Sequence, residues 1–204
     1  DMVKEKLISK KEAVLRIDPN SLDTLLHPTL DEKSSINVIA NGLPASPGAA
    51  SGKVVFTSEE AERLTGMMQD TILVRVETSP EDIQGMHAAK GILTARGGMT
   101  SHAAVVARGM GRPCVSGSSE IDINYENKSF KTSSMEIKEG EIITIDGSTG
   151  RVISGSVATV KPEISGDFSK LMSWADSFRK LNIRTNAETP KDTKTAKDFG
   201  AEGI

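Results

Sequence analysis

A buried strand, a glycine turn and a helix start follow one another in the middle of the chain, and this order constrains the fold most strongly. The apolar run Gly-Ile-Leu-Thr-Ala at residues 91–95 predicts a strand. Gly97 and Gly98 permit the tight backbone path that leaves it. Thr100 or Ser101 can then cap a helix by accepting from its free amides. The chain is therefore expected to fold as an α/β protein with a histidine in the first helical turn.

That histidine, His102, occupies a place suited to phosphate chemistry. The first turn of a helix carries free N–H groups and partial positive charge, which bind an anion and disfavour an imidazolium. A neutral imidazole beside an anion site is what a phosphoryl-accepting nucleophile needs. Arg96 and Arg108 can act as charge partners of a phosphate. Plainer interpretations remain open here: a packing role for His102, a capping role for Thr100, and pairing of Arg108 with the helix dipole.

Composition excludes several classes of function. With 28 acidic and 25 basic side chains, a net charge of −3 gives no broad basic face, so we predict no nucleic-acid binding. No apolar run approaches the length of a membrane span, and no signal-peptide pattern is present. The single cysteine, Cys114, allows no internal disulfide, which favours a cytoplasmic location. His87 has no partners at metal-ligand spacing, so no metal site is expected.

The sequence divides into four parts. Residues 1–36 hold two helical patterns, around 9–16 and 21–26, and are interpreted as the trailing edge of a preceding domain or a connector. A mixed layered domain is expected over 37–158, followed by a linker helix within 159–182. Residues 183–204 read as a strand, a helix and an incipient second strand, which cannot bury themselves alone. The chain is therefore expected to be a piece of a longer protein.

Within 37–158 the pattern predicts alternating strands and helices. The run at 42–52 is rich in small residues and turn formers, so it is interpreted as a linker or as a tight loop against another backbone. The remaining predictions are strands at 53–56, 71–76 and 113–117, helices starting at 57 and 79, irregular hairpin material at 121–138, and a hairpin at 141–153.

Residues 97–111 closely resemble the phosphohistidine motif of the pyruvate phosphate dikinases, within the PEP-utilising enzymes. Met99 favours this group over the phosphoenolpyruvate synthases and the first enzyme of the sugar phosphotransferase system, where an arginine usually follows the glycine pair. The resemblance covers nearly the whole chain, with further matching stretches at 43–48, 77–83, 146–150 and 184–190.

This resemblance implies a swivelling β/β/α phosphohistidine domain between an ATP-grasp nucleotide domain and a C-terminal (β/α)8 barrel that binds pyruvate or phosphoenolpyruvate. Residues 1–36 would be the helical tail of the nucleotide-binding region, and 183–204 the truncated start of the barrel. His102 would accept a pyrophosphoryl group from ATP, give its terminal phosphate to inorganic phosphate, and pass the remaining phosphoryl group to pyruvate. The residues expected to bind phosphate or to regulate are Gly97, Gly98, Thr100, Ser101, Arg96 and Arg108. Thr100 aligns with a threonine that a regulatory kinase phosphorylates in some members.

The resemblance also implies magnesium, ATP, phosphate and pyruvate as ligands of the full-length enzyme, which is commonly a homodimer. The ATP, magnesium and pyruvate sites are expected outside these 204 residues, so the piece alone is expected not to turn over. Two alternatives stay open. One is a phosphoenolpyruvate synthase, which uses water in place of phosphate as acceptor, and the other is a non-enzymatic docking module whose glycine turn is purely structural.

Overall fold

The computed structural model describes residues 1–18, 22, 27–31, 35–160, 166–187, 189–198 and 200–203, without the side chains of 191, 192, 195 and 198. The chain folds into two compact units, one made of residues 1–18 with 164–204 and the other of residues 19–163. The larger unit contains the whole of the layered domain expected over 37–158. Within the described ranges, no helix has the length and apolar character that crossing a bilayer requires.

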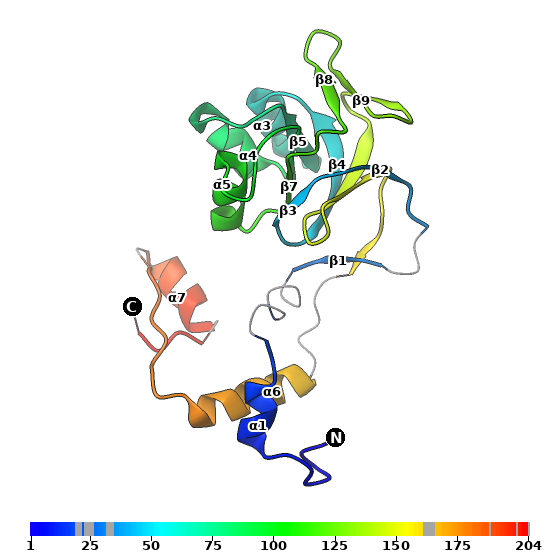
Figure 1. The fold of residues 1–204 in the computed structure, drawn as a ribbon. Coiled ribbons are helices and arrows are strands. Elements are labelled where there is room, and N and C mark those ends of the chain that lie inside the picture. The colour runs from blue at the N-terminus through cyan, green and yellow to red at the C-terminus, as the bar shows by residue number, and fades with distance from the viewer. Residues whose placement is uncertain are drawn as a thin grey trace. The chain divides into compact units, whose positions relative to one another are not determined.

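An eight-stranded mixed sheet forms the centre of the larger unit (Figure 1). Its four central strands, β4 to β7, run parallel, as expected where each is joined to the next through a helix. The outer pairings are antiparallel. In spatial order the strands are β2 (Val38–Asn41), β12 (Arg151–Ser154), β11 (Ile142–Asp146), β4 (Ala49–Val55), β5 (Thr71–Arg75), β6 (Gly91–Thr94), β7 (Cys114–Ser116) and β3 (Leu43–Ser46).

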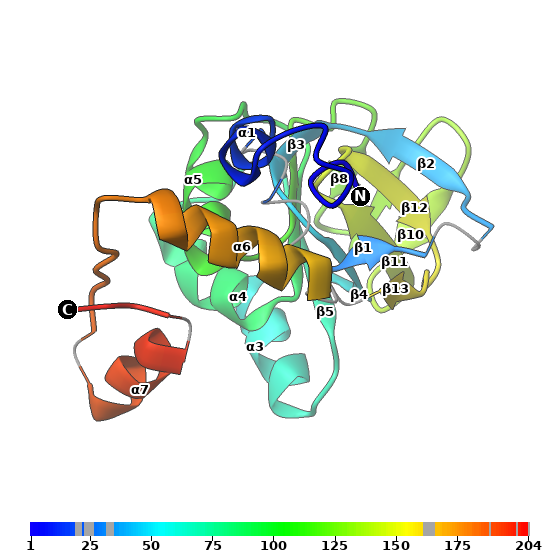
Figure 2. The ribbon, with the colours of Figure 1, turned by 90° about the horizontal axis from the view of Figure 1, so that it is seen from below.

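The helices of this unit lie together on one face of the sheet (Figures 1 and 2). They are α3 (Ser58–Gly66), the 3-10 turn η1 (Pro80–Asp82) leading into α4 (Ile83–Ala88), and α5 (His102–Met110). The predicted cap of α3 is confirmed, because the Thr57 hydroxyl accepts from the Glu60 amide at 3.2 Å. Each helix joins two neighbouring parallel strands, so the loops that follow β5 and β6 emerge at the same edge of the sheet.

A three-stranded sheet covers the other face, in the order β10 (Glu136–Lys138), β9 (Ser129–Lys131) and β8 (Asp122–Asn124). Successive residues on the parallel strands point to opposite faces, which separates two hydrophobic cores. Val54, Ile72 and Leu93 pack with Phe130 and Ile137 of the small sheet, whereas Val55, Leu73 and Ile92 pack with Ala61, Met86 and Ala104 of the helices. The hairpins expected at 121–138 and 141–153 are confirmed.

Two predictions about strands are wrong. Residues 42–52 are no linker: they hold β3 and most of β4, which turn at Gly48 with φ +108°. Their small side chains allow close packing, since a Cβ on Gly52 would lie 2.8 Å from the Thr71 nitrogen. Conversely, residues 183–187 form no strand but only a single bridge from Arg184 to Gly203.

The smaller unit holds α1 (Lys10–Leu15), α6 (Gly166–Phe178) and α7 (Pro190–Asp198). The helix predicted around 9–16 is confirmed, and Ser9 caps α1 by accepting from the Glu12 amide at 3.1 Å. The Glu202 carboxylate binds the Arg179 guanidinium at 2.6 Å, and this hydrogen bond lowers the pKa of Glu202 to about 2. Apart from Leu22, the second helix expected at 21–26 lies outside the described residues.

A short antiparallel pair joins the two ends of the larger unit. β1 (Thr29–Leu30) pairs with β13 (Thr159–Val160), and the Asp31 amide donates to the Ala158 carbonyl at 2.9 Å. The chain therefore passes into and out of this unit on neighbouring strands.

Candidate active site

His102 is the first residue of α5, at the carboxyl edge of the parallel strands. Ser101 is the N-cap, and its hydroxyl accepts from the Ala104 amide at 3.3 Å. Gly111 ends the helix with φ +64°, the left-handed conformation that glycine adopts without strain. The amides of His102 and Ala103 are too early in the helix to find a partner within it. The half-buried imidazole therefore stands beside free backbone donors, as the sequence predicts.

Thr78 holds the imidazole from the neighbouring loop. Its hydroxyl lies 3.0 Å from Nδ1 of His102. Nδ1 is thus engaged, and Nε2 has no partner among the residues that the structure describes. When Nδ1–H donates to the threonine oxygen, Nε2 keeps its lone pair and can attack an electrophile. Thr78 was not among the predicted site residues, although it lies in the motif stretch 77–83.

The glycine pair has two different roles. Gly97 has φ +114°, and a Cβ there would lie 2.9 Å from the Ser116 hydroxyl and 3.0 Å from the Ser101 side chain. A Cβ on Gly98 would meet nothing within 4 Å. The tight turn into α5 therefore requires glycine at position 97 and imposes no such requirement at 98.

Of the two predicted hydroxyl ligands, Ser101 is occupied with structural contacts. Besides capping α5, its oxygen lies 3.3 Å from the hydroxyl of Ser116, which in turn accepts from buried Thr94 at 3.2 Å. Thr100 is exposed and makes no hydrogen bond within the described ranges. Thr100 therefore remains the freer of the two hydroxyls to meet a phosphate.

The two predicted arginines also differ. Arg108 donates through Nε to the Ala45 carbonyl at 2.9 Å and through Nη2 to the Met99 carbonyl, so it ties the loop before α5 to β3. Arg96 is exposed, and its guanidinium has no ion pair in the part of the chain that is described. Arg96 is thus the arginine of this pair with donors left for an anion.

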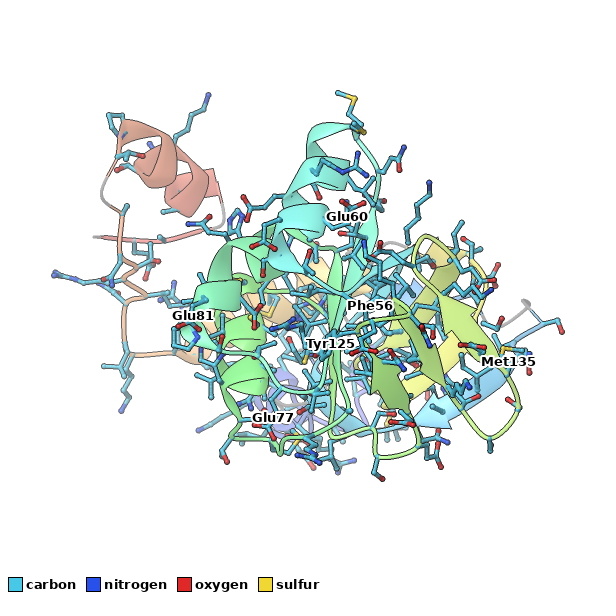
Figure 3. All side chains as sticks on the ribbon, turned by 90° about the horizontal axis from the view of Figure 1, so that it is seen from above. Phe56, Glu60, Glu77, Glu81, Tyr125 and Met135 are labelled. Carbon is cyan, nitrogen blue, oxygen red and sulfur yellow. The ribbon has the colours of Figure 1, made fainter. Side chains whose placement is uncertain are left out.

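The segment after β5, which carries Thr78, also carries the acidic side chains of Glu77 and Glu81. The carboxylate of Glu81 accepts from the Ser79 hydroxyl at 2.5 Å, and this bond, together with a hydrogen bond from the backbone, lowers the pKa of Glu81. Figure 3 shows Glu77, from the loop after β5, and Glu81, from η1. An incoming phosphate therefore needs positive charge from another direction.

His102 does not line any of the three hollows found among the described residues. A hollow of about 570 Å³ in the larger unit is lined by Gly111 and Arg112, at the opposite end of α5, and by Lys90 and Asp70. This hollow lies away from His102, which is not among its lining residues. Among the described residues, no three His, Cys, Asp or Glu side chains come together as a metal site. The described residues therefore offer no such three-ligand site for a magnesium ion.

Comparison with known proteins identifies relatives of this arrangement. Residues 67–150 match the family described as PEP-utilising enzyme, mobile domain. Over 100% of its length the chain is 59% identical to pyruvate, phosphate dikinase of Rhizobium meliloti (strain 1021) and 56% identical to that of Clostridium symbiosum. It is 53% identical to the chloroplastic pyruvate, phosphate dikinase 1 of Oryza sativa subsp. japonica. The chain covers 23%, 24% and 22% of these proteins, so it spans about a quarter of their length.

Proposed function

We propose that this chain carries the mobile domain of a PEP-utilising enzyme and that His102 relays a phosphoryl group in a pyruvate, phosphate dikinase. The family match over residues 67–150 and the identity to pyruvate, phosphate dikinases along the whole chain support this proposal. The observation that carries the proposal is the 3.0 Å contact between Thr78 and Nδ1 of His102. It orients the ring and leaves Nε2 as the nucleophile. A neutral imidazole nitrogen needs no base to remove a proton before it attacks phosphorus.

The proposed reaction has three transfers. Nε2 of His102 attacks the β-phosphorus of ATP, a new N–P bond forms, and the bond to the departing AMP oxygen breaks. An oxygen of inorganic phosphate then attacks the terminal phosphorus of the pyrophosphoryl-histidine, which releases pyrophosphate and leaves a phosphohistidine. Finally the enolate oxygen of pyruvate takes the phosphoryl group, which forms phosphoenolpyruvate and restores the imidazole.

Residues of this chain contribute orientation and anion binding to these steps. The free amides at the start of α5 and the exposed side chains of Thr100 and Arg96 are the groups offered to phosphoryl oxygens. Ser101, Gly97 and Arg108 shape the turn that presents His102. We assign Gly98 no contact with the substrate.

The remaining machinery is proposed to lie in other parts of the protein. These are an ATP-grasp domain, which would bind ATP with magnesium, and a (β/α)8 barrel for pyruvate, of which residues 183–204 would be the start. The mobile domain would swing between them, in a cytoplasmic homodimer. The position of His102 at the start of α5, on one edge of the sheet, supports this arrangement, because a relay residue has to enter two separate active sites.

A histidine substitution in the full-length protein tests the proposal. His102→Asn is expected to abolish both ATP/AMP exchange and pyruvate/phosphoenolpyruvate exchange, and to remove an acid-labile, base-stable phosphate label. His87→Asn, on the exposed face of α4, is the matched control and should keep both exchanges. If His102→Asn kept either exchange at the wild-type rate, His102 would not be the phosphoryl carrier.

The same assays separate the alternatives. A dikinase needs inorganic phosphate and releases pyrophosphate, whereas a phosphoenolpyruvate synthase uses water and releases phosphate. Turnover of the intact protein without any label on His102 would instead favour a docking module. The 204 residues alone are expected not to phosphorylate pyruvate.

A further inference from the structure

The loop that carries Thr78 is anchored by an aromatic side chain from the opposite layer of the domain. Tyr125 lies in the turn between β8 and β9, which the Asn127 amide closes by donating to Asn124 at 2.9 Å. The base of this hairpin is fixed, since Phe130 and Ile137 of the same sheet are buried in the core. Tyr125 therefore projects from a rigid support.

Three contacts direct the Tyr125 ring toward the end of β5. Its hydroxyl accepts from the Val76 amide at 2.9 Å. The ring packs edge-on against Phe56, with centroids 6.4 Å apart, and the guanidinium of Arg75 lies 5.3 Å from the ring centroid (Figure 3). The phenol oxygen is thereby placed at the first residue beyond the strand.

The backbone of Val76 links this tyrosine to both loops of the site. While its N–H donates to Tyr125, its carbonyl accepts from the Arg96 amide at 2.9 Å. Residue 96 opens the turn that leads to His102, and residue 76 opens the loop that leads to Thr78. A shift of the Val76 backbone would therefore change the distance between the two side chains.

The far end of the Thr78 loop is held separately. Buried Asp82 accepts from the Ser79 amide and from the Ser58 hydroxyl, each at 3.0 Å. Because Asp82 holds Ser79, loss of the Tyr125 hydroxyl would free the loop at its Val76 end. Only Glu77 and Thr78 lie between the two anchored residues.

We propose that Tyr125 is a positioning residue for His102, acting through the Val76 backbone and Thr78 to hold the imidazole with Nε2 outward. It touches neither the imidazole nor a substrate. The catalytic consequence rests on the proposed function, but the positioning itself is measurable without any phosphoryl transfer.

Nitrogen NMR of the histidine rings tests the positioning directly. The chain has three histidines, so a sample labelled with ¹⁵N at histidine gives a simple spectrum in which His27 and His87 are internal references. Tyr125→Phe keeps the ring packing and removes the acceptor of the Val76 amide. At constant pH it should move the ring signals of His102 in the same direction as Thr78→Val does, and leave the other two histidines unchanged.

A matched control and a double variant sharpen the test. Ser134→Ala removes a hydroxyl from the loop between β9 and β10, where it pairs with Thr132, and should leave the His102 signals in place. In a Thr78→Val background, Tyr125→Phe should add no further change. Unmoved His102 signals in Tyr125→Phe, or an undiminished effect in the double variant, would overturn the proposal.

Two further measurements complete the design. In the wild-type chain the Val76 amide should exchange slowly with solvent, and rapid exchange would contradict the anchor even if Tyr125→Phe failed to fold. In the full-length protein, Tyr125→Phe should slow both exchange reactions about tenfold, with KM for ATP unchanged. If His102→Asn proved fully active, the relay would fail while the NMR result still decided the role of Tyr125.

Discussion

The hydroxyl of Thr78 lies 3.0 Å from Nδ1 of His102, although 24 positions separate the two residues in the sequence. Two adjacent parallel strands bring them together, because the loops after β5 and β6 leave the sheet at the same edge. A residue on a different loop from the histidine thus engages one of its two ring nitrogens and leaves the other without a partner among the described residues.

Removal of this hydroxyl should slow phosphoryl transfer without unfolding the protein. Thr78→Val is expected to lower both exchange rates about tenfold, the equivalent of one hydrogen bond. Thr78→Ser keeps the hydroxyl and should retain most of the rate. Isotope-exchange kinetics of the full-length protein measure the effect, and a wild-type rate in Thr78→Val would remove Thr78 from the site.

The two glycines before α5 should respond differently to alanine. Gly97→Ala places a Cβ 2.9 Å from the Ser116 hydroxyl at φ +114°, so it should reduce the free energy of unfolding by about 2 kcal/mol. Gly98→Ala meets no atom within 4 Å and should change it by less than about 0.5 kcal/mol. Urea unfolding of both variants is the measurement. Equal losses would contradict the distinction.

The two arginines offer a second matched pair. Arg108→Met loses the hydrogen bonds to the Ala45 and Met99 carbonyls and should destabilise the chain by about 1–2 kcal/mol. Arg96→Met should leave stability within about 0.5 kcal/mol, because its guanidinium has no ion pair in the described part of the chain. In the full-length protein Arg96→Met should instead weaken the phosphate-dependent step. A destabilised Arg96→Met variant with unchanged kinetics would reverse these roles.

Cys114 should be unreactive in the folded protein. Burial raises the pKa of its thiol from 9.0 to about 12, so the folded state holds this proton more tightly than the unfolded state does. The unfolded chain releases the proton first, and the contribution of Cys114 to stability is therefore lost as the pH rises above about 9. Iodoacetamide at pH 8.5 should label Cys114 only after urea is added. Rapid labelling without urea would show that the thiol is exposed.

The sequence predicted those helices whose ends are marked by capping residues or glycine. Thr57 and Ser101 cap helices where expected, and Gly111 ends α5. The strands in 42–52 were missed because alanine, serine and glycine carry little strand propensity. They form strands since only small side chains fit between close backbones, as at Gly52 against Thr71.

The contents of the site were only partly predictable. His102 follows a glycine turn and begins a helix, so the local sequence was enough to predict it as a site residue. Thr78 lies on a neighbouring loop and Tyr125 in the opposite layer of the domain. Only the pairing of strands and the packing of layers bring them close to the histidine turn. Thr78 lay within a matching stretch of motif, whereas the stretch around Tyr125 looked like ordinary hairpin material.

The pairing of β1 with β13 places the entry and the exit of the chain in the larger unit side by side, with Thr29 opposite Val160. All the residues that shape the turn before His102 lie between β1 and β13 in the sequence. The two strands at which the chain enters and leaves this region are therefore neighbours. Grafted into an exposed loop of a host protein, it would need only short linkers, because neither end has to travel across the fold.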